Sequence, residues 1–142
     1  NNEICETISR GMFVTMLIGI YDSNTSELLL ANAGHEPPII IDGDDKFSNF
    51  EEAGPPLGIV PKTQYKEYKL PFNKSSMYIF TDGITEIKNP EGNELGSKGF
   101  QNYIMRYKDK ANNERLKLII DSVLNSKYLQ KDDLTIVVVD SK

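Results

Sequence analysis

The sequence predicts an α+β fold in which strands and helices form separate layers. Three observations support this prediction. Apolar runs rich in β-favouring residues and separated by turn formers extend over residues 12–81, apolar residues then recur at helical spacing, and residues 134–139 form a last apolar run. Because strands come first, then two helices, then one strand, the order favours segregated layers over a regular βαβ repeat.

The first two strands are predicted to form a β-hairpin. Residues 12–21 are apolar, residues 22–26 are turn formers, and residues 28–33 resume the apolar run. The sequence Gly34-His35-Glu36-Pro37-Pro38 ends the second strand, because proline cannot donate a hydrogen bond to a sheet.

Four further strands are predicted along the chain, at residues 39–41, 65–70, 77–81 and 134–139. The acidic residues 42–45 are interpreted as a turn and not as a calcium loop, because Lys46 falls where a ligand is needed. The last strand is apolar at every position from 136 to 139, which is typical of a central strand covered on both faces.

Two helices are predicted between residues 97 and 124. The apolar residues that recur at helical spacing are Phe100, Tyr103, Ile104 and Tyr107 in the first, and Leu116, Ile119, Ile120, Val123 and Leu124 in the second. Ser97 is the predicted cap of the first helix, and Asn112 or Asn113 of the second.

The bulk composition limits the classes of function. The 142 residues fit one domain, and the net charge of −5 argues against nucleic-acid binding, which needs clustered Lys and Arg. The acidity serves solubility or groups carboxylates for cations. Cys5 is the one cysteine, so no internal disulfide can form, and a cytoplasmic location is expected. No apolar stretch is long enough to span a membrane.

Thr81-Asp82-Gly83 is the first candidate for chemistry. Asp82 directly follows a predicted buried strand, and strand ends hold side chains rigidly while leaving them open to a ligand. Gly83 allows a backbone or ligand to approach closely. The alternative is a turn with no further role, because Asp-Gly is a common turn sequence.

Asp132 and Asp133 form the second candidate, directly before the last strand. Adjacent carboxylates repel each other, and a divalent cation would remove this repulsion. Mg²⁺ and Mn²⁺ prefer such hard oxygen ligands, and they can activate a bound water and neutralise phosphoryl oxygens. The alternative is a solvated turn.

His35 is the one histidine, and it is either a ligand or acid–base group or a structural residue that holds the turn at Pro37 and Pro38. The chain offers no convincing Ser-His-Asp or Cys-His set for nucleophilic catalysis.

Five segments in this order resemble the SpoIIE/RsbU branch of the PP2C (PPM) protein phosphatases, and together they span nearly the whole chain. They are Gly11-Met12-Phe13-Val14-Thr15, Asn32-Ala33-Gly34-His35-Glu36-Pro37-Pro38, Gly54-Pro55-Pro56-Leu57-Gly58, Thr81-Asp82-Gly83-Ile84-Thr85-Glu86 and Asp132-Asp133-Leu134-Thr135.

The resemblance implies a β-sandwich flanked by helices, with two Mn²⁺ or Mg²⁺ ions whose bridging water hydrolyses phosphoserine or phosphothreonine. It implies that Asp82 and Asp132 bind metal, with Asp133 beside them where broader relatives often carry asparagine. His35 occupies a position near an accessory metal in eukaryotic relatives, where the residue is acidic. Gly83 is a further accessory candidate.

The family's upstream motif, Asp-x-x-Gly-His-Gly, does not occur in the sequence. We therefore expect residues 1–142 to be a single domain without its N-terminal portion, inactive by itself and inclined to self-associate through the incomplete sheet. The resemblance further implies a phosphorylated STAS-type anti-sigma-factor antagonist as substrate and an N-terminal regulatory or sensor domain, which could tether the protein to a membrane. It also allows a homodimer. The main alternative is a non-catalytic PP2C-like binding module, and an unrelated α+β domain ranks below both.

Overall fold

A computed structural model describes residues 1–9, 11–48, 50, 54–125 and 133–141. The chain divides into two compact units, Asn1–Ser76 with Asp140–Lys142, and Met77–Val139, and each is described by itself. The prediction of one domain over residues 1–142 stays a prediction. No helix in the described part of the chain has the length and apolar composition needed to cross a bilayer.

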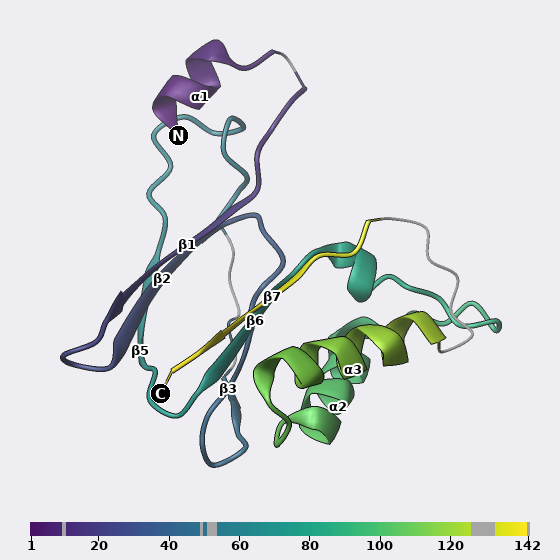
Figure 1. Ribbon diagram of the computed structural model, residues 1–142. Helices are drawn as coiled ribbons and strands as arrows, with labels where there is room; N and C mark the ends of the chain where they lie inside the picture. The colour runs from purple at the N-terminus through teal and green to yellow at the C-terminus, as the bar shows by residue number, and fades with distance from the viewer. Residues whose placement is uncertain (10, 49, 51–53, 126–132, 142) are drawn as a thin grey trace. The chain divides into compact units, whose positions relative to one another are not determined.

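The first unit contains an antiparallel sheet of three strands in the order β1-β2-β5 (Figure 1). The strands are β1 (Met16–Asp22), β2 (Glu27–Ala33) and β5 (Glu67–Pro71). The predicted hairpin is confirmed, because β1 pairs with β2 from Met16–Ala33 to Asp22–Glu27. At its turn the Asp22 carboxylate accepts the N–H of Asn24 at 2.8 Å.

The first unit also contains α1 (Asn2–Thr7), β3 (Ile39–Ile41) and β4 (Phe47–Ser48). Strands β3 and β4 are antiparallel. The predicted turn between them is confirmed, because Asp42 Oδ1 accepts the N–H groups of Asp44 and Lys46, each at 2.9 Å.

Strand β1 has an exposed apolar face. Ile18 is 57% exposed and Ile20 65%, and their partners on β2 are Ala31 and Leu29. Leu28 and Leu30 point to the other face and are 3% and 1% exposed, because side chains alternate along a strand. The apolar sequence of β1 therefore does not correspond to burial on both sides.

The second unit contains β6 (Ser76–Phe80), the 3₁₀ turn η1 (Asp82–Ile84), α2 (Gly96–Tyr107), α3 (Asn112–Asn125) and β7 (Ile136–Asp140). The predicted cap Ser97 is wrong, because α2 already begins at Gly96. The N–H groups of Leu95 and Gly96 donate to the carbonyls of Ile87 and Thr85, so the preceding loop holds the helix start without a side-chain cap.

The core of the second unit lies between β6 and the two helices. Phe80 and Phe100 are 1% and 0% exposed, and their ring centroids are 4.8 Å apart in an edge-to-face arrangement. The ring of Tyr78 also packs edge-to-face with Phe100, at a centroid distance of 6.4 Å. The helices are joined by the hydrogen bond between Tyr107 Oη and Ser122 Oγ, at 2.8 Å. Phe100 and Ile104 of α2 and Ile119 and Val123 of α3 are buried, as predicted. Leu124, which was predicted to share this face, is 46% exposed.

The prediction that the last strand is covered on both faces is wrong. β7 pairs with β6, and its residues alternate between half-buried and exposed. Val137 is 48% exposed and Val139 is 40% exposed. A run of valines favours a strand at every position, so the sequence alone does not distinguish a strand with one covered face from one with two.

Candidate metal-binding site

Asp82 lies directly after β6, as the first residue of η1. Asp82 is exposed, whereas the next three residues, Gly83, Ile84 and Thr85, are buried. Its carbonyl oxygen accepts the N–H of Glu86 at 2.8 Å and the hydroxyl of Thr85 at 3.1 Å. The backbone of Asp82 is therefore fixed while its carboxylate faces solvent.

The second acidic segment, residues 133–135, runs against the first. Thr81 joins the two through three hydrogen bonds. Its hydroxyl donates to the carbonyl oxygen of Asp133 at 3.2 Å and accepts the N–H of Thr135 at 3.1 Å. Its own N–H donates to the carbonyl oxygen of Thr135 at 3.2 Å. The pairing of β6 with β7 thus continues into the two segments that carry Asp82 and Asp133.

Gly83 makes a close backbone contact with the same segment. A Cβ atom at Gly83 would lie 2.7 Å from the carbonyl oxygen of Asp133 and 3.2 Å from Leu134 Cδ2. Real Cβ atoms do not approach a backbone oxygen so closely, so only glycine fits here without a shift of one segment. The close approach that Gly83 was predicted to allow is therefore made by the chain's own backbone.

The structure brings together the segments that carry Asp82 and Asp133, which are 51 positions apart in the sequence. Asp133 is also exposed. Asp132, the other predicted ligand, lies outside the described residues. The ligand roles of Asp82, Asp132 and Asp133 stay predictions.

Carboxylate oxygens on adjacent, well-held segments suit Mn²⁺ or Mg²⁺. The described residues contain no group of three or more His, Cys, Asp or Glu side chains placed to hold a metal ion. Asp82 and Asp133 would therefore supply only part of the oxygen ligands that such an ion needs.

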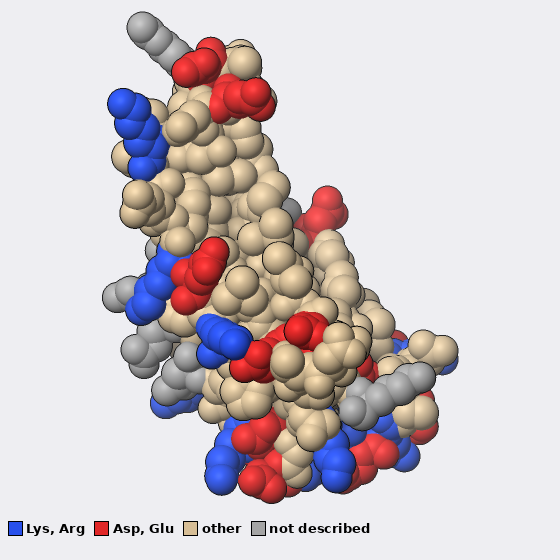
Figure 2. Space-filling view, turned by 90° about the vertical axis from the view of Figure 1, so that its left-hand side faces the viewer, with Lys and Arg blue, Asp and Glu red and all other residues tan. Residues whose placement is uncertain are grey.

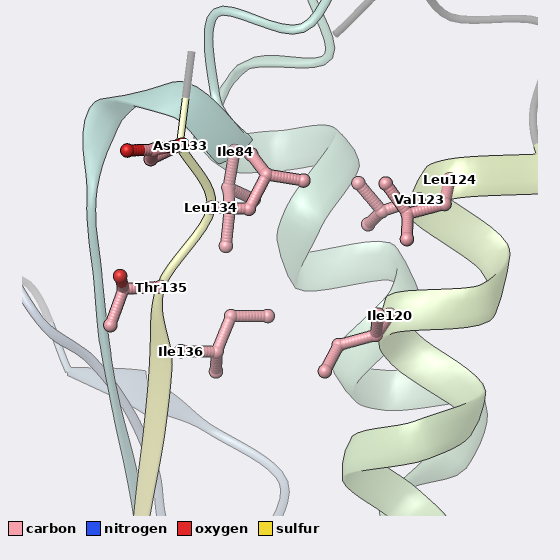
Figure 3. Close-up of a pocket in the computed structure, with 8 residues that line it drawn as sticks. All are labelled: Ile84, Ile120, Val123, Leu124, Asp133, Leu134, Thr135 and Ile136. Carbon is pink, nitrogen blue, oxygen red and sulfur yellow. The ribbon is translucent and has the colours of Figure 1, made fainter.

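A cavity of about 520 Å³ lies beside Asp133, which lines it together with Thr135 and six aliphatic residues (Figure 3). Leu134 lies beside Ile84 and Ile136 points toward Ile120 of α3, whereas the side chains of Asp133 and Thr135 point to the other side of the segment. This alternation follows from strand geometry. The cavity therefore belongs mainly to the apolar layer under the helices, and the carboxylate of Asp133 points to the opposite face of its segment.

His35 lies in the first unit, in a turn organised by the side chain of Asn32. Asn32 is 2% exposed; its amide oxygen accepts the N–H of His35, and its amide nitrogen donates to the carbonyl of His35, each at 2.8 Å. His35 Nδ1 is 2.9 Å from the carbonyl oxygen of Glu36. Because a carbonyl only accepts, this contact places a proton on Nδ1. These contacts favour the structural interpretation of His35.

Two of the five quoted segments interlock around this turn. Gly34 has φ +71°, and a Cβ atom there would lie 2.6 Å from Pro56 Cγ. Gly54 donates its N–H to the carbonyl of Asn32 at 3.0 Å, and Tyr65 Oη donates to the carbonyl of Pro55 at 3.0 Å.

Charges of both signs are interspersed over the face shown in Figure 2. Lys69 and Glu27 form a salt bridge at 2.8 Å. Within the described residues of this face there is no continuous basic surface of the kind that nucleic-acid binding requires.

The fold defines the class of protein. The model matches the SiaA-PP2C domain of Pseudomonas aeruginosa with a TM-score of 0.81 at 17% identity, over 99% of this chain and 58% of that chain. It matches the phosphatase domain of SpoIIE from Bacillus subtilis with a TM-score of 0.69 at 19% identity, over 98% of this chain and 62% of that one. The predicted PP2C-like α+β fold is confirmed.

Residues 1–142 match the model of the protein family described as stage II sporulation protein E (SpoIIE). The chain therefore belongs to the SpoIIE family. The phosphoserine phosphatase RsbU of Bacillus subtilis (strain 168) is 30% identical over 145 aligned positions, which cover 100% of this chain and 43% of RsbU. The chain thus spans less than half the length of that relative.

Proposed function

We propose that this chain carries part of the catalytic domain of a metal-dependent protein serine/threonine phosphatase. The observation that supports this proposal most directly is the contact of Thr81 and Gly83 with residues 133–135, which brings two acid-bearing segments of the family's sequence pattern together. Membership of the SpoIIE family and the likeness to RsbU support this class of reaction.

Asp82 and Asp132 are the proposed metal ligands, and Asp133 supports them from the adjacent position. Mn²⁺ or Mg²⁺ is the proposed metal; crystals of the SpoIIE phosphatase domain were presoaked with Mn, and the related fold of RsbX was solved with magnesium. Bound ions would supply an activated water and neutralise phosphoryl oxygens. Thr85 and Glu86 fix the backbone of Asp82, so its carboxylate needs little reordering when a cation binds.

The proposed substrate is phosphoserine or phosphothreonine on a regulatory protein of the STAS type. RsbU is described as a phosphoserine phosphatase, and a SpoIIE structure includes a fragment of a regulatory domain. We extend the phosphoserine substrate and the regulatory domain to this protein. A homodimer is one assembly that it could form.

The test is release of phosphate from a phosphoserine protein by the full-length protein with Mn²⁺. Asp82→Asn should lower kcat on the order of 100-fold or more, because a lost metal ligand removes several kcal/mol of transition-state stabilisation. Asp121→Asn makes the same chemical change at an exposed position of α3 and should leave kcat unchanged. Full activity of Asp82→Asn would refute the assignment.

The second candidate is a non-catalytic PP2C-like binding module. It is favoured by one observation, namely that the described residues contain no group of three or more His, Cys, Asp or Glu side chains placed to hold a metal ion. Such a module would bind a partner without releasing phosphate even as the full-length protein with Mn²⁺. For the same reason we expect the 142-residue chain alone to release little or no phosphate.

A further inference from the structure

We propose that Thr81 is a positioning residue whose hydroxyl sets the spacing of the two acid-bearing segments and thereby the metal affinity of the site. This inference rests on the proposed function. It assigns a role to a side chain that is not itself a ligand, and it separates that role from a contribution to stability.

Both hydrogen bonds of the Thr81 hydroxyl go to the opposite segment. Its hydroxyl donates to the carbonyl of Asp133 and accepts the N–H of Thr135, on either side of Leu134. A hydroxyl has one donor and two acceptor positions, so one group holds both ends of this short stretch. Asp133 carries the carbonyl that Thr81 holds, and Asp82 directly follows Thr81, so the backbones of the two acids are held in a fixed register.

The hydroxyl is not used locally. Thr81 is the N-cap residue of η1, where a threonine side chain commonly accepts a hydrogen bond from the turn that follows. It makes no such cap bond here. The side chain is directed instead to residues more than 50 positions away in the sequence, which indicates that its role is to join the two segments.

The clamp is half-exposed, so water competes for its hydrogen bonds and its effect on folding is small. Metal affinity depends more steeply on geometry, because ligands must be held close to their productive positions. Residues that orient metal ligands typically change affinity about 10- to 100-fold when they are substituted. The two measurements therefore separate a positioning role from a purely structural one.

The experiment measures Mn²⁺ binding to the full-length protein by isothermal titration calorimetry, together with the urea midpoint of unfolding. Thr81→Val removes the hydroxyl and keeps the shape; its Kd for Mn²⁺ should rise about 10- to 100-fold. Thr81→Ser keeps the hydroxyl and should stay within about threefold of the wild type, on the same reasoning. Thr81→Ala is a second variant without a hydroxyl, included in case valine fits poorly at this position. Its Kd for Mn²⁺ should rise as much as that of Thr81→Val.

Thr63→Val is the matched control in the other unit. The hydroxyl of Thr63 also donates to a backbone carbonyl, that of Val60, at 2.7 Å. Its loss should lower the unfolding midpoint about as much as Thr81→Val does, and leave the affinity for Mn²⁺ unchanged.

The inference is wrong if Thr81→Val and Thr81→Ala bind Mn²⁺ as the wild type does, or if Thr81→Ser loses as much affinity as they do. The proposed function is tested separately by Asp82→Asn. Wild-type Mn²⁺ affinity and activity in Asp82→Asn would remove the basis for both, whereas loss in Asp82→Asn with wild-type affinity in the two Thr81 variants would reject the clamp alone.

Discussion

The hydroxyl of Thr81 donates a hydrogen bond to the carbonyl oxygen of Asp133, a residue 52 positions further along the chain. This bond lies beyond the last residue of β6 and before the first residue of β7. Two segments that the sequence separates by two helices therefore form one surface, on which both Asp82 and Asp133 are exposed.

Gly83→Ala should disturb this surface from the backbone side. The added Cβ would lie 2.7 Å from the carbonyl oxygen of Asp133, and a backbone atom has little freedom to move away. We expect a loss of about 1–3 kcal/mol in the free energy of unfolding, the usual cost of overpacking. The measurement is a urea titration of the chain.

Gly43→Ala is the control for that experiment. A Cβ at Gly43 would meet Lys74 at 3.3 Å, at an exposed turn with room to adjust. It should change stability by less than about 0.5 kcal/mol. Equal losses for the two variants would contradict the tight contact at Gly83.

Phe100→Ala should destabilise the second unit severely. Phe100 is 0% exposed and packs against the rings of both Tyr78 and Phe80. Removal of a buried phenylalanine costs about 3–5 kcal/mol through lost transfer free energy and the cavity left behind. The change should appear as loss of near-ultraviolet circular dichroism from tyrosine at a lower urea concentration; an unchanged midpoint would contradict the packing.

Much of this architecture could be predicted from the sequence, because strands and helices follow local patterns. The two apolar runs on either side of the turn formers at residues 22–26 predicted the hairpin, and the spacing of Phe100 and Ile104 predicted α2. The burial of β7 was predicted wrongly, because its valines fit a strand with one covered face and a strand with two covered faces equally well.

The site was predicted in part. Asp82 and Asp133 follow from their position beside strands, whereas the role of Thr81 depends on a contact 52 residues away. A threonine before Asp-Gly normally indicates a local cap, so no local signal identifies such a clamp. Asp132 lies outside the described residues, and its ligand role stays a prediction.

Tyr65 should make the first unit sensitive to alkaline pH. Burial raises the pKa of its phenol above the ordinary value of 10.0, and the sulfur of Cys5 adds to this. A raised folded pKa means that the neutral hydroxyl, which donates to Pro55, is favoured by folding. Its stabilising contribution is complete below the unfolded pKa near 10.0 and is lost as pH rises through the folded pKa.

The measurement is the urea midpoint as a function of pH between about 8 and 12, a window that brackets an ordinary tyrosine pKa. The wild type should lose stability over the upper part of this window, and Tyr65→Phe should lose less because it has no hydroxyl to ionise there. Identical pH profiles for the two proteins would argue against a role for Tyr65.

Ile18 and Ile20 should cause the 142-residue chain to self-associate. They are 57% and 65% exposed on one face of β1, and contiguous exposed apolar surface favours association. Replacing both by threonine keeps the β-branched shape and should weaken association about tenfold or more, given about 1 kcal/mol or more per side chain. Sedimentation velocity across a concentration series measures this.

Ile59→Thr is the matched substitution outside the strand. Ile59 is 50% exposed in the loop before β5 and should leave the sedimentation behaviour unchanged. A monomeric wild-type chain at all concentrations, or equal effects of the three isoleucines, would contradict association through β1.

The contact between Gly34 and Pro56 has a consequence for sequence variation within the family. Position 34 has a positive φ, and a side chain there would overlap the proline ring, with a Cβ only 2.6 Å from Pro56 Cγ. The two positions are therefore not free to vary independently. A relative with a larger residue at the first should carry a smaller one at the second, so the pair should covary as a unit.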